Sequence, residues 1–336
     1  MSNKAAVMTG LNVIEIQDRP EPVAGPGQAV VRPISVGVCG SDVTYYKYGR
    51  IGNYIVTGDI ILGHEVAGDV ESVGEGVTNV KPGDRVAIEP GTPCRQCADC
   101  LKGNYHLCLD LVFMATPPYD GCLVQQMLLD ARTLFPIPDS MSYEEGALIE
   151  PLSVGLWGCR RINLQPGDHV LVTGAGPVGL TAAEVAWALG AASVVVADIS
   201  DFRLGLAAKH GFETETPDNP IDRSFDVLLE CSGVDGVMAA GLERLGNAGR
   251  CAMIGMHKTP TLPLALASLN PQELTIALIN RYNGTWPVGI ALAASGRVNL
   301  KDFVTDEFTL SQTAEALNNT STNPKALKAI IHPQQL

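Results

Sequence analysis

Four cysteines lie within a span of fifteen residues, and this cluster is the clearest candidate for metal chemistry in the chain. Their spacing is Cys94-x-x-Cys97-x-x-Cys100-x₇-Cys108. Thiolates spaced in this way can surround a tetrahedral Zn²⁺ from a single loop, and four sulfur ligands leave the metal no open position. Free thiols on an exposed loop would be prone to oxidation. The pattern therefore predicts a structural zinc site.

A glycine-rich segment, Gly174-Ala175-Gly176-Pro177-Val178-Gly179, has the G-x-G-x-x-G spacing that binds a dinucleotide. It follows a strand pattern and opens a helix pattern, whose free N–H groups can bind phosphates. Asp198 lies nineteen positions after Gly179 and can accept hydrogen bonds from both hydroxyls of a ribose. A 2′-phosphate would meet this carboxylate, so the pattern predicts NAD rather than NADP. Arg203 is expected on the adenosine side.

The elements around the glycine segment alternate between strand and helix. Short apolar runs predict strands at 169–173, 193–197, 226–230 and 249–254, and helix patterns fall at 180–189, 202–210 and 237–245. This order implies a parallel sheet with right-handed crossovers, and therefore a doubly wound nucleotide-binding domain of the Rossmann type. Trp187 is expected in its core.

The first 150 residues or so have a different texture, with short Val/Ile runs between Gly and Pro turn pairs. Runs at 29–31, 65–73 and 84–89 predict strands of an irregular all-β unit. Residues 143–161 have a helix-compatible pattern that is interrupted at Pro151, and a short helix is expected at 288–295.

Composition limits the classes of partner. The 336 residues are 46% hydrophobic and 18% charged, which excludes a disordered or fibrous protein. The net charge of −13 disfavours nucleic acid and anionic membrane surfaces as partners. No apolar stretch is long enough to span a membrane, and Met1–Gly10 lacks the apolar core of a signal peptide. Nine unevenly spaced cysteines without such a signal indicate a reducing compartment, so a cytoplasmic location is expected.

Two further segments, Gly37-Val38-Cys39-Gly40-Ser41-Asp42 and Gly63-His64-Glu65-x₂-Gly68, are not linked by spacing alone. Together with the cysteine loop and the glycine segment, they occur in the order seen in zinc-dependent medium-chain dehydrogenases/reductases, which the chain resembles over essentially its whole length. Within that family, five segments are similar to the polyol (sorbitol and xylitol) dehydrogenases: 45–52, 86–91, 115–118, 144–155 and 281–287.

The resemblance implies a GroES-like β-rich catalytic domain at 1–151, a Rossmann domain at 152–285 and a return to the catalytic domain at 286–336. It implies NAD and two zinc ions per chain, one structural and one catalytic, in a homotetramer, with a dimer as the alternative. The stretch 212–225 is short and polar where relatives carry a further strand and helix, so the sheet is expected to be trimmed at that edge.

The resemblance also implies roles for individual residues. Cys39, His64 and Glu65 would bind the catalytic zinc, with Glu150 at its fourth side, either ligating it or holding a metal-bound water. Alcohol dehydrogenases of the superfamily commonly have a cysteine there, and a glutamate makes the site harder and more oxygen-rich. Glu150 and Glu65 would be catalytic, with Ser41 a possible proton relay; alternatively, Ser41 only caps a helix.

Substrate and cofactor contacts complete the implied site. The residues expected to line the substrate pocket are Tyr45, Phe113, Thr116, Glu150, Arg281 and Tyr282. Those expected against the cofactor beyond the glycine segment are Ile254, Gly255, Met256, Asn280 and Arg281.

The expected reaction is NAD-linked oxidation of an internal hydroxyl of a sugar alcohol to the ketose, with zinc as the Lewis acid. Two alternatives stay open. One is another zinc-dependent medium-chain dehydrogenase acting on butanediol, threonine or a simple alcohol. The other is a non-catalytic nucleotide-binding protein built on the same fold.

Overall fold

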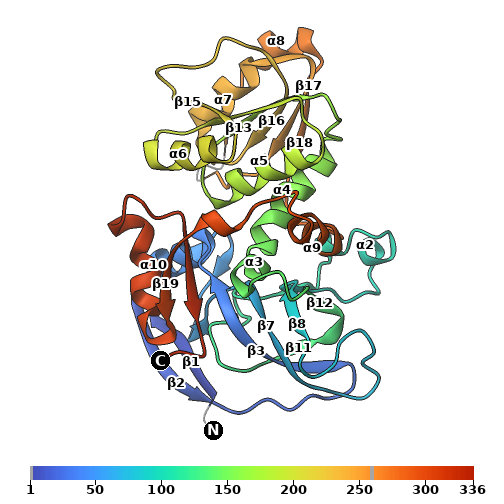
Figure 1. Ribbon diagram of the computed structural model, residues 1–336, viewed down its shortest axis with the longest axis vertical. Coiled ribbons are helices and arrows are strands. Elements are labelled where there is room, and N and C mark those ends of the chain that lie inside the picture. The colour runs from blue at the N-terminus through green and yellow to red at the C-terminus, as the bar shows by residue number, and fades with distance from the viewer. Residues whose placement is uncertain (1–2, 258–260) are drawn as a thin grey trace. The chain divides into compact units, whose positions relative to one another are not determined.

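The computed structural model describes residues 3–257 and 261–336, which form two compact units. The first unit comprises Met1–Glu150 and Phe303–Leu336, and the second comprises Pro151–Asp302 (Figure 1). The second boundary differs from the expected return at 286. Helix α9 (Trp286–Ala294) is almost wholly apolar and belongs to the second unit, with Trp286 and Ile290 buried.

The first unit is built on mainly antiparallel β-structure, in which only β19 and β20 of its named strands pair in parallel. A seven-stranded sheet has the order β12-β8-β7-β3-β20-β19, with β11 also paired to β3, and a three-stranded sheet has the order β2-β1-β6. The strands of these sheets are β1 (Asn3–Gly10), β2 (Val13–Arg19), β3 (Gln28–Gly37), β6 (Ile60–Ile61), β7 (Glu65–Val73), β8 (Arg85–Ile88), β11 (Met127–Asp130), β12 (Leu134–Pro136), β19 (Val304–Thr309) and β20 (Lys328–His332).

Smaller elements connect these strands. Two short hairpins pair β4 (Arg50–Ile51) with β5 (Tyr54–Ile55) and β9 (Gly91–Thr92) with β10 (Val112–Phe113). The helices of this unit are α1 (Gly40–Tyr48), α2 (Ala98–Leu101), α3 (Tyr143–Ala147) and α10 (Thr313–Thr322). Its core is aliphatic and includes Val31, Val36, Val66 and Ile331, which come from three adjacent strands.

The pairing of β20 with β3 is the feature of this unit that most affects the site. Ile331 lies opposite Val36 and Ile330 opposite Gly37, so the end of the chain pairs with the end of β3. On the other side of β3, Gly37 lies opposite Glu65 at the start of β7. The ends of three strands that are distant in sequence therefore meet at one place.

The second unit is the expected doubly wound domain, and the predicted fold class is confirmed. Its six-stranded parallel sheet has the order β15-β14-β13-β16-β17-β18. The elements are β13 (His169–Thr173), α5 (Pro177–Ala188), β14 (Ser193–Ala197), α6 (Asp201–Lys209), β15 (Glu213–Glu215), β16 (Phe225–Glu230), α7 (Asp235–Glu243), β17 (Leu245–Met253), α8 (Leu266–Leu269) and β18 (Thr275–Leu278), followed by α9. One core cluster of this unit, between sheet and helices, includes Leu171, Val195, Leu228 and Leu242.

Three local expectations need correction. Helix α4 (Ile149–Arg161) runs through Pro151, because proline is tolerated in the first turn of a helix; the break before it falls at Leu148. The stretch 212–225 keeps an edge strand, β15, which pairs with β14, although no helix forms before β16. Trp187 is 54% exposed on the last turn of α5 rather than in the core.

Residues Asn3–Gly10 form β1, whereas Met1 and Ser2 lie outside the described residues. Within the described ranges, no helix is both long enough and apolar enough to cross a membrane.

Candidate metal centres and nucleotide site

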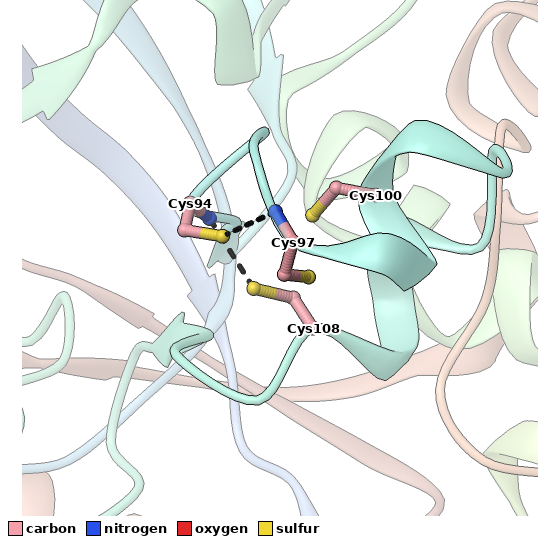
Figure 2. A group of neighbouring side chains, drawn as sticks. All are labelled: Cys94, Cys97, Cys100 and Cys108. Carbon is pink, nitrogen blue, oxygen red and sulfur yellow. Dashed lines mark hydrogen bonds between the residues drawn. The ribbon is translucent and has the colours of Figure 1, made fainter.

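The cysteine loop gathers all four thiols around one point. Each pair of sulfur atoms among Cys94, Cys97, Cys100 and Cys108 lies within 4.8 Å, and Figure 2 shows them turned towards a common centre. Tetrahedral zinc with Zn–S bonds of about 2.3 Å requires sulfurs roughly 3.8 Å apart. The donor set and its spacing therefore fit a closed four-thiolate zinc site.

Backbone N–H groups of the loop are directed at its sulfur atoms, whereas burial acts against them and raises the pKa of Cys100 to about 12 and also that of Cys108. The N–H of Cys94 donates to the Cys108 sulfur at 3.3 Å, and the N–H of Cys97 donates to the Cys94 sulfur at 3.4 Å. A backbone N–H at Cys100 lowers the pKa of Cys97 to about 7. N–H donors directed at sulfur stabilise the anion, which is the form that binds metal.

A second group of possible ligands lies where β3, β7 and β20 end. A ligand atom from each of Cys39, His64 and Glu65 lies within 4.8 Å of the other two. Cys39 is the N-cap of α1, two residues after β3 ends. His64 immediately precedes β7, and Glu65, the first residue of β7, pairs with Gly37, the last residue of β3. One thiolate, one imidazole and one carboxylate leave a fourth position open, as catalytic zinc sites do.

The electrostatics of this second group suit a cation. Burial by itself would lower the pKa of His64, but the Asp42 and Cys39 side chains outweigh it and hold that pKa well above the ordinary 6.5. The pocket thus stabilises positive charge at the position of the imidazole. A buried pocket that stabilises positive charge, lined by thiolate, imidazole and carboxylate donors, fits a bound zinc ion.

Asp42 contacts two of the three residues of this group and was not predicted from the sequence, although it lies in the quoted Cys39 segment. Its Oδ1 lies 3.5 Å from His64 Nδ1 and accepts the Gly63 N–H at 3.0 Å, while its Oδ2 accepts the Cys39 N–H at 3.0 Å. Burial raises its pKa, but His64 and these N–H donors lower it further, so the carboxylate stays ionised. A carboxylate at Nδ1 leaves Nε2 as the ligand atom and orients the ring.

Lys328, at the start of β20, is the second residue that the sequence analysis missed. Its ammonium group donates to both carboxylate oxygens of Glu65, at 2.8 and 2.6 Å, and to the carbonyl of Val38 at 3.0 Å. Burial lowers its pKa, but Glu65 and Cys39 raise it further, so the group stays charged. No local pattern marks this lysine, because its partners lie 263 and 290 residues away.

The remaining expected residues of the zinc centre lie close to it but outside the ligand group. Glu150 is buried in the first turn of α4 and acts electrostatically on Lys328, yet it does not belong to the three-residue ligand cluster. Ser41 lies half-buried in the first turn of α1, where Cys39 and not Ser41 holds the N-cap position.

Three expected substrate residues surround the same region of the first unit. The Phe113 ring lies 5.8 Å from the His64 ring, between centroids. Burial raises the pKa of Tyr45, and a hydrogen bond with Thr116 only partly offsets this effect. Tyr45 is therefore a neutral hydroxyl donor, suited to bind an uncharged hydroxyl group.

The glycine segment forms the expected turn between β13 and α5. Gly174 has a φ of 90°, and a Cβ on Gly179 would overlap the Gly174 carbonyl, so both positions require glycine. In contrast, a Cβ on Gly176 would meet nothing within 4 Å, which leaves open space for a ligand at the N-cap of α5. Pro177 and Val178 are the first helical residues. This open cradle at a helix N-terminus fits a pyrophosphate.

The other expected cofactor residues lie after the carboxyl ends of neighbouring strands, the edge where such sheets bind ligands. Asp198 follows β14 and accepts the Ala175 N–H at 2.6 Å, which ties it to the glycine turn. Arg203 lies in the first turn of α6. The residues after β17 are Ile254, Gly255 and Met256, and those after β18 include Asn280, Arg281 and Tyr282.

The exposure of these last residues differs. Met256 is 63% exposed, whereas Tyr282 is buried with its ring 4.7 Å from the Trp286 ring, between centroids. Arg281 is half-buried with a φ of 54°. Arg281 and Tyr282 belong to the second unit, whereas Tyr45, Phe113 and Thr116 belong to the first.

Comparison with known proteins agrees with this fold. The family model of the alcohol dehydrogenase GroES-like domain matches residues 25–139, and that of the zinc-binding dehydrogenases matches residues 177–295. The solved structure of 2R,3R-butanediol dehydrogenase from Bacillus subtilis is similar with a TM-score of 0.89, 28% identity, and coverage of 99% of this chain and 100% of that one.

Sequence relatives narrow the family. The sorbitol dehydrogenase of Bacillus subtilis (strain 168) is 40% identical over 99% of this chain and 98% of its own. The human sorbitol dehydrogenase is 41% identical over 94% of this chain and 92% of its own. The chain belongs to the zinc-dependent medium-chain dehydrogenases/reductases, in their polyol dehydrogenase family.

Proposed function

We propose that the protein oxidises an internal hydroxyl of a sugar alcohol, such as sorbitol or xylitol, to the ketose with NAD as the hydride acceptor. The observation that carries the proposal is the Cys39–His64–Glu65 group in a chain that also holds a complete dinucleotide turn. The glutamate at position 150, in place of a cysteine, supports a polyol rather than a simple alcohol as substrate, because it makes the centre richer in oxygen.

In this proposal Cys39, His64 and Glu65 hold the catalytic zinc, which when bound polarises the substrate hydroxyl as a Lewis acid. Asp42 keeps the His64 ring oriented, and Tyr45 and Thr116 offer hydroxyl groups to the polyol. Glu150 accepts the hydroxyl proton, with Ser41 as a relay. Arg281 and Tyr282 bind the distal hydroxyls, and the residues after β17 position the nicotinamide ring.

The proposal includes a second, structural zinc at the four-cysteine loop and NAD as the preferred cofactor. The gathered sulfur atoms support the first assignment, and the Asp198 carboxylate beside the glycine turn supports the second. It further includes a cytoplasmic homotetramer, with a dimer as the alternative. Nine free cysteines support a reducing compartment, and the exposed Leu101 and Leu109 on the cysteine loop support a subunit contact there.

A panel assay tests the function. Purified protein is incubated with NAD or NADP and C4–C6 polyols, 2,3-butanediol, threonine and ethanol, while reduced nicotinamide is followed with and without a chelator. We expect chelator-sensitive reduction of NAD with a polyol. Turnover of butanediol, threonine or ethanol, but of no polyol, would indicate a zinc-dependent dehydrogenase with that substrate instead. No turnover with any of these compounds would favour a non-catalytic nucleotide-binding role.

Matched variants tie the activity to the proposed centre. Cys39→Ala should abolish turnover while NAD binding, measured by fluorescence titration, stays within about twofold, because Cys39 lies in the first unit and the glycine turn in the second. Cys251→Ala is the control, since this buried thiol belongs to no ligand group in the part of the chain that the structure describes. An active Cys39→Ala enzyme would contradict the proposed zinc ligand.

A further inference from the structure

Lys328 and Glu65 form a fully buried ion pair at the proposed catalytic metal centre. Both side chains are only 2% exposed. Removing two charges from water is costly, and a buried pair of this kind is often no more stabilising than apolar residues of the same volume. The pair therefore calls for an explanation other than the stability of the fold.

The hydrogen bonds of Lys328 leave its ammonium group no freedom. An ammonium has three donors. Here they are taken by Glu65 Oε1 at 2.8 Å, Glu65 Oε2 at 2.6 Å and the Val38 carbonyl at 3.0 Å. The first two bonds fix the rotation of the Glu65 carboxylate. The third ties the ammonium group to Val38, the residue that precedes Cys39. One side chain from β20 thus holds the segments that carry two of the three proposed ligands.

The backbone has a matching space for this carboxylate. A Cβ on Gly37, the residue opposite Glu65 in the pairing of β3 with β7, would overlap Glu65 Oε2. Glu65 therefore lies over a glycine on one side and is bound by Lys328 on another. A carboxylate has about four acceptor positions, and Lys328 uses one on each oxygen, so each oxygen keeps one for a metal.

We propose that Lys328 is a positioning residue for Glu65: it sets the orientation in which the carboxylate meets Cys39 and His64, and it offsets the repulsion between this carboxylate and the Cys39 thiolate. This inference rests on the proposed catalytic zinc. It adds a residue, contributed by the C-terminal strand, whose effect on the metal runs through Glu65.

The test follows cobalt(II) substituted into the full-length protein, since the visible bands of cobalt report its ligand set. A site with one thiolate absorbs differently from a site with four, so the two proposed centres are read separately. The rate of cobalt release to a chelator is measured for Lys328→Met, Lys328→Arg, Glu65→Gln and the Lys328→Met/Glu65→Gln double variant. Lys4→Met is the control, because Lys4 forms an ion pair with Asp18 at 2.7 Å in the same unit.

We expect Lys328→Met to release cobalt from the one-thiolate site at least tenfold faster than the wild type, with a spectrum that resembles that of Glu65→Gln. Lys328→Arg should restore most of the wild-type behaviour, and Lys4→Met should match the wild type. Because Lys328 acts through Glu65, the double variant should release cobalt no faster than Glu65→Gln alone.

Three results would overturn the inference. They are additive effects of the two substitutions on cobalt release in the double variant, release from Lys328→Met that is no faster than from the wild type, and a Lys328→Met spectrum that is unchanged from the wild type. If Lys328→Met does not fold, two measurements still test the inference. One compares Glu65→Gln with the double variant, in which an amide replaces the buried carboxylate. The other is cobalt release from Lys328→Arg. A wild type that takes up no cobalt at the one-thiolate site would instead refute the proposed catalytic centre.

Discussion

The Asp198 carboxylate binds backbone N–H groups and also lies where the proposed cofactor would bind. It accepts the Ala175 N–H at 2.6 Å and the Ser200 N–H at 2.8 Å, so it joins the glycine turn to the start of α6. Its negative charge lies where the ribose of a dinucleotide binds in this fold. A residue of this kind contributes to cofactor choice through its charge and to the turn through its acceptor atoms.

We predict that Asp198→Asn lowers the preference for NAD over NADP, measured as the ratio of kcat/KM values, by at least tenfold, because the variant removes the repulsion of a 2′-phosphate. Stability should fall by about 1–2 kcal/mol, since one N–H loses its acceptor. Asp201→Asn, at the exposed first residue of α6, is the control and should leave the ratio unchanged. An unaltered ratio in Asp198→Asn would show that another group selects the cofactor.

Glu89 shows what burial does to a carboxyl beside the cysteine loop. It is buried and accepts a hydrogen bond from the Tyr105 hydroxyl at 2.8 Å. Burial raises its pKa from 4.5 to about 7, although Tyr105 and Arg95 act in the opposite direction. Between these two pH values the folded protein keeps this proton and the unfolded chain loses it, so stability falls as the pH rises from about 4.5 to 7.

In the Glu89→Gln variant, the free energy of unfolding should therefore lose this part of its pH dependence. Above pH 7 it should exceed that of the wild type by at most about 3 kcal/mol. Urea unfolding at several pH values measures the difference. Glu71→Gln, which removes an exposed carboxylate, should leave the slope as it is. If the unfolding free energies of Glu89→Gln and the wild type change with pH in parallel, Glu89 titrates normally.

In the turn from β13 to α5, glycine is required at two positions for two different reasons. At Gly179 the demand comes from the fold, because a side chain would overlap the Gly174 carbonyl. At Gly176 the protein itself leaves the space empty, so the demand comes from the ligand. The same motif thus contains one packing glycine and one binding glycine.

A pair of alanine variants distinguishes these two glycines. Gly176→Ala should keep the Tm within about 2 °C of the wild type and weaken NAD binding at least tenfold, because the methyl group occupies the space of the pyrophosphate. Gly179→Ala should weaken binding and also lower the Tm by several degrees. Calorimetry with NAD titration measures both quantities, and equal Tm losses in the two variants would contradict the distinction.

In the whole chain, the first unit is completed by residues that follow the second unit in sequence. Strand β20 lies between β3 and β19 in the seven-stranded sheet, and it carries Ile330 and Ile331, both fully buried. The sheet of the first unit therefore cannot be complete until the whole chain has been made. The proposed zinc ligands at the end of β3 share this dependence through Lys328.

Truncation tests this dependence. A chain that ends at Leu327 loses β20, and we expect the first unit to be unfolded, with no metal at Cys39, His64 and Glu65. A chain that ends at His332 keeps β20 and should fold and bind metal like the full-length protein. Far-UV circular dichroism and metal analysis of the two proteins measure the result; normal metal content in the shorter chain would show that the sheet closes without its last strand.

The cysteine loop, the glycine turn, the parallel sheet and the separate β-rich unit could all be predicted from the sequence. Each of these depends on residues close together in the chain or on a repeated hydrophobic pattern, so its physical cause is local. The family resemblance added Cys39, His64 and Glu65 as one group, which spacing alone did not link.

Tertiary structure decided the rest. Lys328 reaches Glu65 across 263 positions of sequence, and Gly37 makes room for the same carboxylate through strand pairing. Residues 286–302, which include α9, belong to the second unit, so the chain returns to the first unit at Phe303 and not at 286. Local patterns specify turns, loops and strands, whereas the partners of a buried charge depend on which strands become neighbours, and that is set only when the sheet forms.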